Sequence, residues 1–309
     1  VTSDLDGMKA SILKYGAGSV SYYSTAHLDT NYWNEKTFGM YVPGSALPAD
    51  TYPNHTVTVI GWDDNFSKDN FGNLTPPQDG AWLVKNTWGE DWGDNGYFWL
   101  SYYDAVLTMA GNPADFFAIT ETAEDEHLYQ YDGTTNYSVL NDPDIEKTAN
   151  VFQAQGYEEL TDVCFLTMDP NVDYTIEIYR GGHLNEGDPT GGNSPLSVQS
   201  GNLVEQGYYT IPLDTPVKLN EGDYFSIVMK TSSASNPTIN IPVDASADYG
   251  WFASTASSSQ GQSYFLQKGK WVDLYEPQDM KNFRIKACTK DIAPEITLPS
   301  SPNGYDDCS

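Results

Sequence analysis

Two blocks of sequence decide the fold: NHTVTVIGWDDN at residues 54–65 and DGAWLVKNTWGEDWGDNGYFWLSYYD at residues 79–104. In the first block, His55 stands before a run of β-branched residues. Such a run predicts a strand over residues 56–60, and Gly61 is expected to end it before an Asp-Asp-Asn turn. His55 therefore lies at the start of a predicted strand.

The second block predicts another strand over residues 81–85, which Asp-Gly precedes and Asn86 follows. His55 and Asn86 both lie at strand ends, where neighbouring strands can bring them together. A histidine, with an unperturbed pKa of about 6.5, can take and return a proton near neutrality. An amide beside it can fix the ring orientation. On spacing alone, an ordinary histidine and a turn-forming asparagine are the commoner explanation.

The amino-acid sequence of the two blocks is more diagnostic than the spacing of His55 and Asn86. The two blocks resemble the His block and the Asn block of the papain-like cysteine peptidases, in which K-N-S-W-G-x-x-W-G-x-x-G-Y follows a histidine that precedes a small residue and valine. The resemblance implies that His55 is the base and acid and that Asn86 orients it. It also implies that Trp88 shields their hydrogen bond and that Trp92 lines the leaving-group side. The nucleophile in this family is a thiolate paired with imidazolium.

The resemblance also implies that three further residues take part in substrate binding. Ser21 and Thr56 occupy positions that line the family's second specificity pocket, and Asn54 contributes backbone to that pocket. Ordinary strand packing is the alternative for all three.

The expected nucleophile is missing from the sequence. The family's Q-x-x-x-C-G-S-C-W helix has no counterpart, and the cysteines are Cys164, Cys288 and Cys308, far downstream. The sequence therefore predicts a partner, either a Cys-bearing light chain or an N-terminal segment. A longer molecule of which this is one fragment is a second explanation. A pseudo-enzyme that never had the cysteine is a third.

The start of the chain agrees with the β-rich second half of a papain-like domain. An amphipathic helix is expected there, with Ser3 as its cap and Gly16 closing it, followed by an alternating strand over residues 18–23. The apolar face of this helix is formed by Leu5, Met8, Ile12 and Leu13. Val1 is then expected to be a cut made inside a folded domain.

The remaining connections of this part contain turn-forming residues. Residues 25–53 are expected to form an irregular loop near the substrate. Residues 65–78 are expected to form a surface insertion, because they are rich in Asn, Asp and Pro. Residues 115–120 are expected to be the last strand.

A short acidic stretch at residues 121–126 marks a predicted boundary. We expect a β-rich papain-like half over residues 1–122, a second domain over residues 123–290 and a flexible tail or linker over residues 291–309. Short strands with turn signals between them make the second domain an all-β sandwich. These strands are expected at residues 149–153, 163–168, 174–179, 208–213, 223–230, 263–266 and 283–287. The fold class is thus α+β/all-β.

The sandwich resembles the jelly-roll-like lectin-like domain of bacterial surface cysteine peptidases. The resemblance rests on YTIEIYRGG at 174–182, on GYYTIPLDTPVKLNEGDYFSIVMK at 207–230 and on NFRIKA at 282–287. Carbohydrate binding is implied by the name, while a spacer role is equally common. Trp251, Phe252 and Trp271 are candidates to stack on sugars, or else they belong to the core. Structural calcium is a guess, from the acidic turns at Asp142, Asp144, Asp169, Asp173 and Asp223.

The composition favours an extracellular protein. Fifteen Lys and Arg against 43 Asp and Glu give a net charge of −28, which repels nucleic acid and anionic membranes. No apolar run is long enough to span a membrane. A sequon at Asn54-His55-Thr56 would carry a glycan over the site, which favours a bacterial origin.

We therefore expect a secreted or cell-surface cysteine endopeptidase that cleaves peptide or protein substrates through a thioester and needs no cofactor. The alternative is an inert papain-like scaffold that acts in carbohydrate binding or adhesion through the sandwich.

Overall fold

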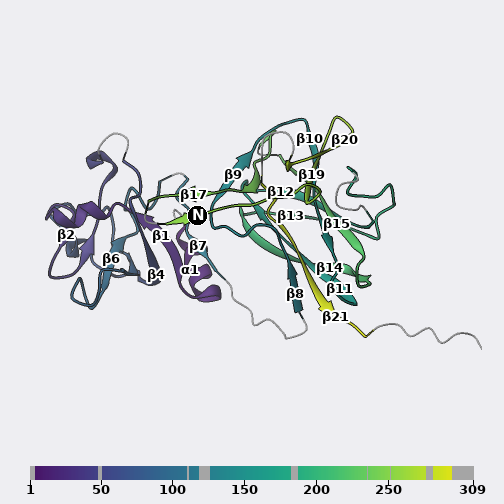
Figure 1. Ribbon diagram of the computed structural model, residues 1–309. Coiled ribbons are helices and arrows are strands. Elements are labelled where there is room, and N and C mark those ends of the chain that lie inside the picture. The colour runs from purple at the N-terminus through teal and green to yellow at the C-terminus, as the bar shows by residue number, and fades with distance from the viewer. Residues whose placement is uncertain are drawn as a thin grey trace, which may run out of the picture. The chain divides into compact units, whose positions relative to one another are not determined.

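The chain divides into two compact units, residues 1–121 and residues 122–309, which are described in turn (Figure 1). The structure, a computed structural model, describes residues 4–47, 51–109, 111–117, 126–181, 187–234, 236–250, 252–275 and 281–293. None of the helices in these ranges is both long enough and apolar enough to cross a membrane.

The first unit is built on a seven-stranded sheet in the order β2-β3-β6-β5-β4-β1-β7. Its strands are β1 (Gly18–Tyr22), β2 (Trp33–Asn34), β3 (Gly39–Met40), β4 (His55–Asp63), β5 (Ala81–Lys85), β6 (Tyr97–Ser101) and β7 (Asp115–Phe116). The helices are α1 (Leu5–Tyr15) and the short 3-10 helices η1 (Ser24–Leu28), η2 (Gly44–Ala46) and η3 (Lys68–Asn70). All pairings of the sheet are antiparallel except that of β3 with β6.

Helix α1 forms as predicted and buries one face. Met8 and Ile12 join the same buried cluster as Val20 of β1 and Val57 of β4. Leu13, expected on this face, is 78% exposed, because the residue after Ile12 points about 100° further round the helix. The cap is Asp4, whose carboxylate accepts from the Gly7 N–H at 3.0 Å. Ser3, the predicted cap, lies outside the described residues.

Strand β4 is longer than predicted. Gly61 does not end it, since Gly61 pairs with Leu83 of β5 and the strand runs on to Asp63. A register shift between Val59 and Gly61 takes up one extra residue there. Such a bulge lets pairing resume beyond the interruption.

The two predicted loops of this unit are more ordered than expected. Residues 25–53 contain η1 and the short strands β2 and β3. The segment 65–78 is anchored in the interior by Phe66 and Phe71, which pack in a buried cluster with Tyr41. The segment is therefore a surface insertion only in part. Its many Asn, Asp and Pro residues predicted exposure, whereas its two aromatic residues are buried.

A buried carboxylate fixes the turn after β6. Asp104 is 1% exposed. It accepts hydrogen bonds from the backbone N–H groups of Val42, Val106 and Leu107 at 3.0, 3.1 and 3.0 Å. Burial raises the pKa of Asp104 to about 6, while the backbone hydrogen bonds oppose that rise.

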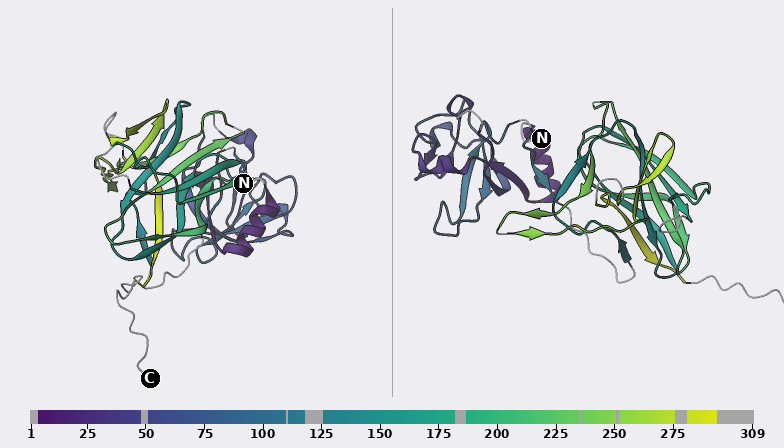
Figure 2. Two further views of the ribbon diagram at one scale, coloured as in Figure 1. Left: turned by 90° about the vertical axis from the view of Figure 1, so that its right-hand side faces the viewer. Right: turned by 45° about the horizontal axis from the view of Figure 1, so that its top comes forward.

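The second unit is a β-sandwich, as predicted. Figure 2 shows the strands of this unit in teal, green and yellow. One sheet has the order β13-β12-β15-β10-β19-β20 and the other β14-β11-β21-β8. Phe225 of the first sheet and Leu160, Phe165 and Ile285 of the second belong to one buried core. Side chains of both sheets thus meet between them.

Over the residues that the structure describes, the second unit has more strands than predicted, and four of them pair in two small sheets of two strands each. Those that match a predicted run are β10 (Ile145–Gln153), β11 (Glu158–Thr167), β12 (Val172–Arg180), β14 (Gly207–Leu219), β15 (Tyr224–Ser233), β19 (Ser263–Gln267) and β21 (Ile285–Asp291). Those that were missed are β8 (Glu126–Tyr129), β9 (Tyr137–Leu140), β13 (Ser197–Leu203), β16 (Ile241–Asp244), β17 (Ala247–Asp248), β18 (Ala253–Ser254) and β20 (Lys270–Asp273). Most of the missed strands are short, and the polar residues of β13 hide its alternation.

Two cysteines of the sandwich face each other as free thiols. Cys164 of β11 and Cys288 of β21 lie on neighbouring antiparallel strands, where Cys288 is the register partner of Asp162. Their Sγ atoms are 3.3 Å apart. Cys308 lies outside the described residues.

We expect mild oxidation by a small disulfide to join Cys164 and Cys288, with release of two equivalents of small thiol. Alkylatable thiols in the denatured chain should fall from three to one, the one being Cys308. The closed loop is long, so the midpoint of thermal unfolding of the sandwich should rise by on the order of 5 °C. Cys288→Ser is the matched control and should show no rise. A bond to Cys308, or no oxidation, would contradict this expectation.

Candidate active site

The pairing of β4 with β5 brings the two residues singled out in the sequence together. His55 begins β4, and Asn86 directly follows β5. The His55 Nε2 and Asn86 Oδ1 atoms are 2.9 Å apart. Asn86 is 5% exposed, whereas His55 is only partly buried. The histidine is thus held by an interior amide and still accessible from outside.

The orientation of the amide sets the proton positions on the ring. The Thr87 N–H donates to Asn86 Oδ1 at 2.8 Å, which identifies this atom as the oxygen. A carbonyl oxygen only accepts, so His55 Nε2 is the donor in their contact. In the neutral ring, the lone pair is then on Nδ1. That nitrogen is the one able to take a proton from another group.

Trp88 covers the histidine. Its ring stacks on that of His55, with 5.1 Å between the centroids and 15° between the planes. Trp92 meets Trp88 edge-on at 4.9 Å and stacks on Trp33 at 5.2 Å. Trp88 thus lies over the histidine whose hydrogen bond it is expected to shield, and Trp92 packs against Trp88. Their roles in catalysis stay predictions.

We expect Trp88→Ala to lower kcat/KM for peptide cleavage by about 5-fold to 10-fold. Without the ring, water competes for the contact of His55 with Asn86, and a hydrogen bond of this kind contributes about 1 kcal/mol. Trp88→Phe keeps a flat ring and is the matched control. Equal losses in both variants would show that the indole acts in some other way than by covering His55.

Two residues near the site were not found by sequence reasoning. Tyr22 of β1 is the register partner of His55, and its ring centroid is 5.8 Å from that of the histidine. His27 of η1 lies 4.7 Å from Trp88 between ring centroids, and its Nδ1 donates to the Ser24 carbonyl at 2.6 Å. The sequence around Tyr22 and His27 does not identify them as site residues, because only the folding of the chain brings them next to His55 and Trp88.

The predicted substrate-binding residues lie side by side. Ser21 and Thr56 are register partners across β1 and β4, and their hydroxyl oxygens are 2.9 Å apart. Asn54 holds the start of η1, since its Oδ1 accepts from the Ser24 N–H at 2.8 Å and its Nδ2 donates to Thr25 Oγ1 at 2.9 Å. The structure thus gives Asn54 a clear positioning role. Substrate contact by these three residues stays a prediction.

The aromatic candidates of the sandwich differ in exposure. Phe252 is 39% exposed. Trp271 is partly buried against a cluster that includes Ala149 and Val151, so it is not a free platform for a sugar. Trp251 lies outside the described residues. Carbohydrate binding stays a prediction.

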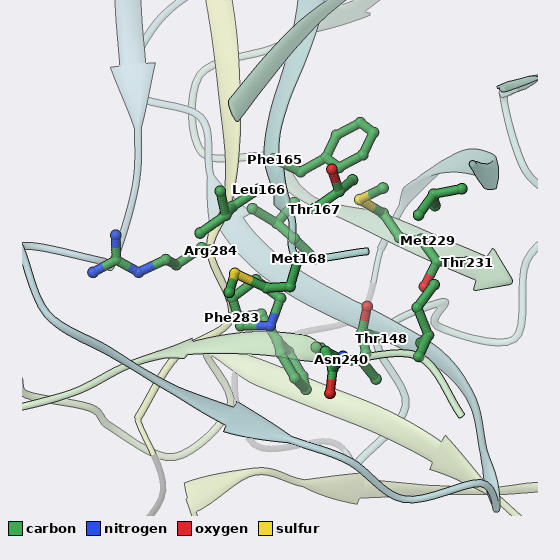
Figure 3. A pocket seen from close by; sticks show the side chains of 15 residues that line it. Thr148, Phe165, Leu166, Thr167, Met168, Met229, Thr231, Asn240, Phe283 and Arg284 are labelled. Carbon is green, nitrogen blue, oxygen red and sulfur yellow. The ribbon is translucent and has the colours of Figure 1, made fainter. Parts of the chain in front are cut away.

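One cavity lies between the sheets of the sandwich, lined by apolar side chains such as Met168, Met229 and Phe283 (Figure 3). Its volume is about 40 Å³, enough for a water or two. The Arg284 side chain extends away from Met229, and its guanidinium donates to Asp244.

The acidic turns proposed for calcium have protein partners. Within the ranges given above, no group of three or more His, Cys, Asp or Glu side chains is placed to hold a metal ion. Calcium binding stays a prediction. The contacts are those of Asp142 with Gln267, Asp144 with Lys268, Asp169 with Asn240, Asp173 with Asn202 and Asp223 with Arg180.

Family models match both units. Residues 6–117 match the model of the papain family cysteine protease, and residues 128–289 match that of the lectin like domain. Each match falls within one of the two units, 1–121 and 122–309.

Similar proteins include a solved structure with the same combination of domains and a plant protein that matches a shorter stretch. The clostridial cysteine protease Cwp84 after propeptide cleavage is 27% identical, with a TM-score of 0.71 over 94% of this chain and 69% of its own. A structure of the cysteine protease and lectin-like domains of Cwp84, a surface layer associated protein of Clostridium difficile, is 28% identical, with a TM-score of 0.68 over 93% of this chain and 61% of its own. The Oryzain gamma chain of Oryza sativa subsp. japonica is 34% identical over 86 residues, which are 28% of this chain. Those residues span 21% of the length of the rice protein.

Proposed function

We propose a function for a chain whose residues 128–289 belong to the lectin-like domain family and whose residues 6–117 match the model of the papain family cysteine protease. It supplies the base and the orienting amide of a surface-associated cysteine endopeptidase. The 2.9 Å contact between His55 Nε2 and Asn86 Oδ1, beneath the Trp88 ring, is the observation that carries this proposal.

The proposed reaction is acyl transfer through a thioester. His55 takes the proton of a cysteine thiol at Nδ1, and the thiolate attacks the peptide carbonyl. The imidazolium then gives its proton to the leaving amine. In the second half, His55 takes a proton from water, which attacks the thioester and releases the acid. Asn86 keeps the ring aligned through both halves, and no cofactor enters.

The thiol is proposed to come from a segment outside these 309 residues. Residues 1–163 contain no cysteine. Cys164 and Cys288 belong to the sandwich, where their side chains contact each other. A light chain or an N-terminal segment that carries the nucleophile accounts for this arrangement, with peptide or protein as substrate.

The protein is proposed to act outside the cell or at its surface. The net charge of −28 and the similarity to Cwp84, a surface layer associated protein, support this location. The lectin-like unit is then proposed to hold the peptidase at that surface.

Cleavage of a fluorogenic peptide library by the natively purified protein tests the proposal. Cleavage should be blocked by iodoacetamide and by a peptide epoxide. A chelator is the control and should leave the rate unchanged. Cleavage that survives complete alkylation of thiols would refute the assignment.

A further inference from the structure

A buried phenol stands directly behind the His55–Asn86 pair. Tyr22 of β1 is 0% exposed, and its Oη has no standard hydrogen-bond partner among the described residues. Asn86 Nδ2 is likewise buried and without a hydrogen-bond partner among the described residues. A buried donor or acceptor without a partner costs about 1–3 kcal/mol, so two such atoms beside a functional histidine need a physical reason.

The two atoms are complementary. Burial raises the pKa of Tyr22 well above its usual value, and a side-chain interaction with Asn86 lowers it in part. The amide therefore acts on the phenol, with geometry short of an ideal hydrogen bond. Hydrogen bonds at active sites are often long in the free protein and tighten when the site is assembled.

We propose that Tyr22 is a positioning residue for the catalytic pair, which accepts a hydrogen bond from Asn86 Nδ2 and so holds the amide with Oδ1 towards His55 Nε2. This inference rests on the proposed function in so far as His55 is the base. A reversed amide would aim its NH₂ group at Nε2 and at the Thr87 N–H. The Thr87 N–H, which donates to Oδ1, and the phenol, which accepts from Nδ2, thus both favour the orientation of the Asn86 amide with Oδ1 towards His55. Through it they select the tautomer whose Nδ1 is free.

The test is Tyr22→Phe in the complete protease. We expect kcat to fall by about 3-fold to 10-fold with KM nearly unchanged, the size of one lost hydrogen bond. The matched control is Tyr41→Phe, which also removes a buried phenol whose pKa is raised by burial and by the Asp104 carboxylate but, unlike that of Tyr22, is not influenced by Asn86. Its kcat should stay within about 2-fold of the parent.

A double-mutant cycle with Asn86→Ala separates positioning from packing. If Tyr22 acts through the amide, Tyr22→Phe has no further effect on kcat once Asn86 is alanine. The same loss in both backgrounds would overturn the proposal. If Asn86→Ala itself leaves cleavage unchanged, the proposed function fails rather than the role of Tyr22.

A spectroscopic signature gives a readout that does not need cleavage. The ¹⁵N shifts of His55, identified by their loss in His55→Ala, report which ring nitrogen carries the proton. The spectra are taken at mildly alkaline pH after iodoacetamide has alkylated the nucleophile, so that no thiolate holds the ring as imidazolium. With Tyr22, we then expect a neutral ring protonated mainly at Nε2. In Tyr22→Phe, a mixture of the two tautomers is expected. Unchanged shifts would also overturn the proposal.

Discussion

His55→Ala is expected to lower kcat/KM for peptide cleavage by at least about 10³-fold in the complete protease. General acid–base catalysis contributes about 10²-fold to 10⁴-fold, and removing the base also removes the partner that keeps the nucleophile as a thiolate. KM should change little, because the imidazole acts on the reacting atoms rather than on the rest of the peptide. Steady-state kinetics over a range of pH measures both parameters.

The matched control for this loss is His127→Ala. His127 is an exposed histidine of β8 that contacts Asp291 at 2.8 Å. It belongs to the second unit. Its removal should leave cleavage of a small peptide unchanged. Parent-like cleavage by His55→Ala would remove this site from the reaction and favour the inert-scaffold alternative.

Asp104→Ala is expected to destabilise the first unit by about 3–5 kcal/mol. The substitution leaves the backbone N–H groups of Val42, Val106 and Leu107 without their acceptor inside the fold. Each such loss costs about 1–3 kcal/mol, offset in part by removal of a buried charge. Urea unfolding followed by tryptophan fluorescence measures the change. The exposed carboxylate Asp69 of η3 is the control, and Asp69→Ala should shift stability by less than about 0.5 kcal/mol.

The pH dependence of this effect has a definite sign. The folded pKa of Asp104 is about 6, above its ordinary value of 3.8. Between these values the folded chain keeps a proton that the unfolded chain releases, so raising the pH favours unfolding. From pH 4 to pH 7 the wild type should lose on the order of 3 kcal/mol relative to Asp104→Asn, which cannot titrate. A constant difference over this range would show that Asp104 is ionised throughout.

The pair His55 and Asn86 was predictable, because the residues next to each of them in the sequence identify it. His55 and Asn86 stand at the ends of two strands that read clearly in the sequence, and the surrounding motif is specific. Tyr22 was not predictable. Its role depends on the register of β1 against β4, and no residue near it in the sequence reports that register.

The errors in the fold have a similar origin. The expected end of β4 at Gly61 was wrong, because pairing with Leu83 carries the strand past the glycine. Leu13 was placed on the buried face from its hydrophobicity, although its angle on the helix points it to solvent. The seven strands predicted for the second unit all overlap strands that form, because alternation and turn residues persist there even where the boundaries shift, whereas seven other strands of its described residues were missed.

The most direct measurement is labelling of the natively purified protein with a peptide epoxide, followed by mass spectrometry of the labelled peptide. We expect one labelled cysteine, in a segment other than those of Cys164, Cys288 and Cys308, and loss of the label in His55→Ala. A label on one of these three cysteines, or labelling that does not depend on His55, would contradict this expectation.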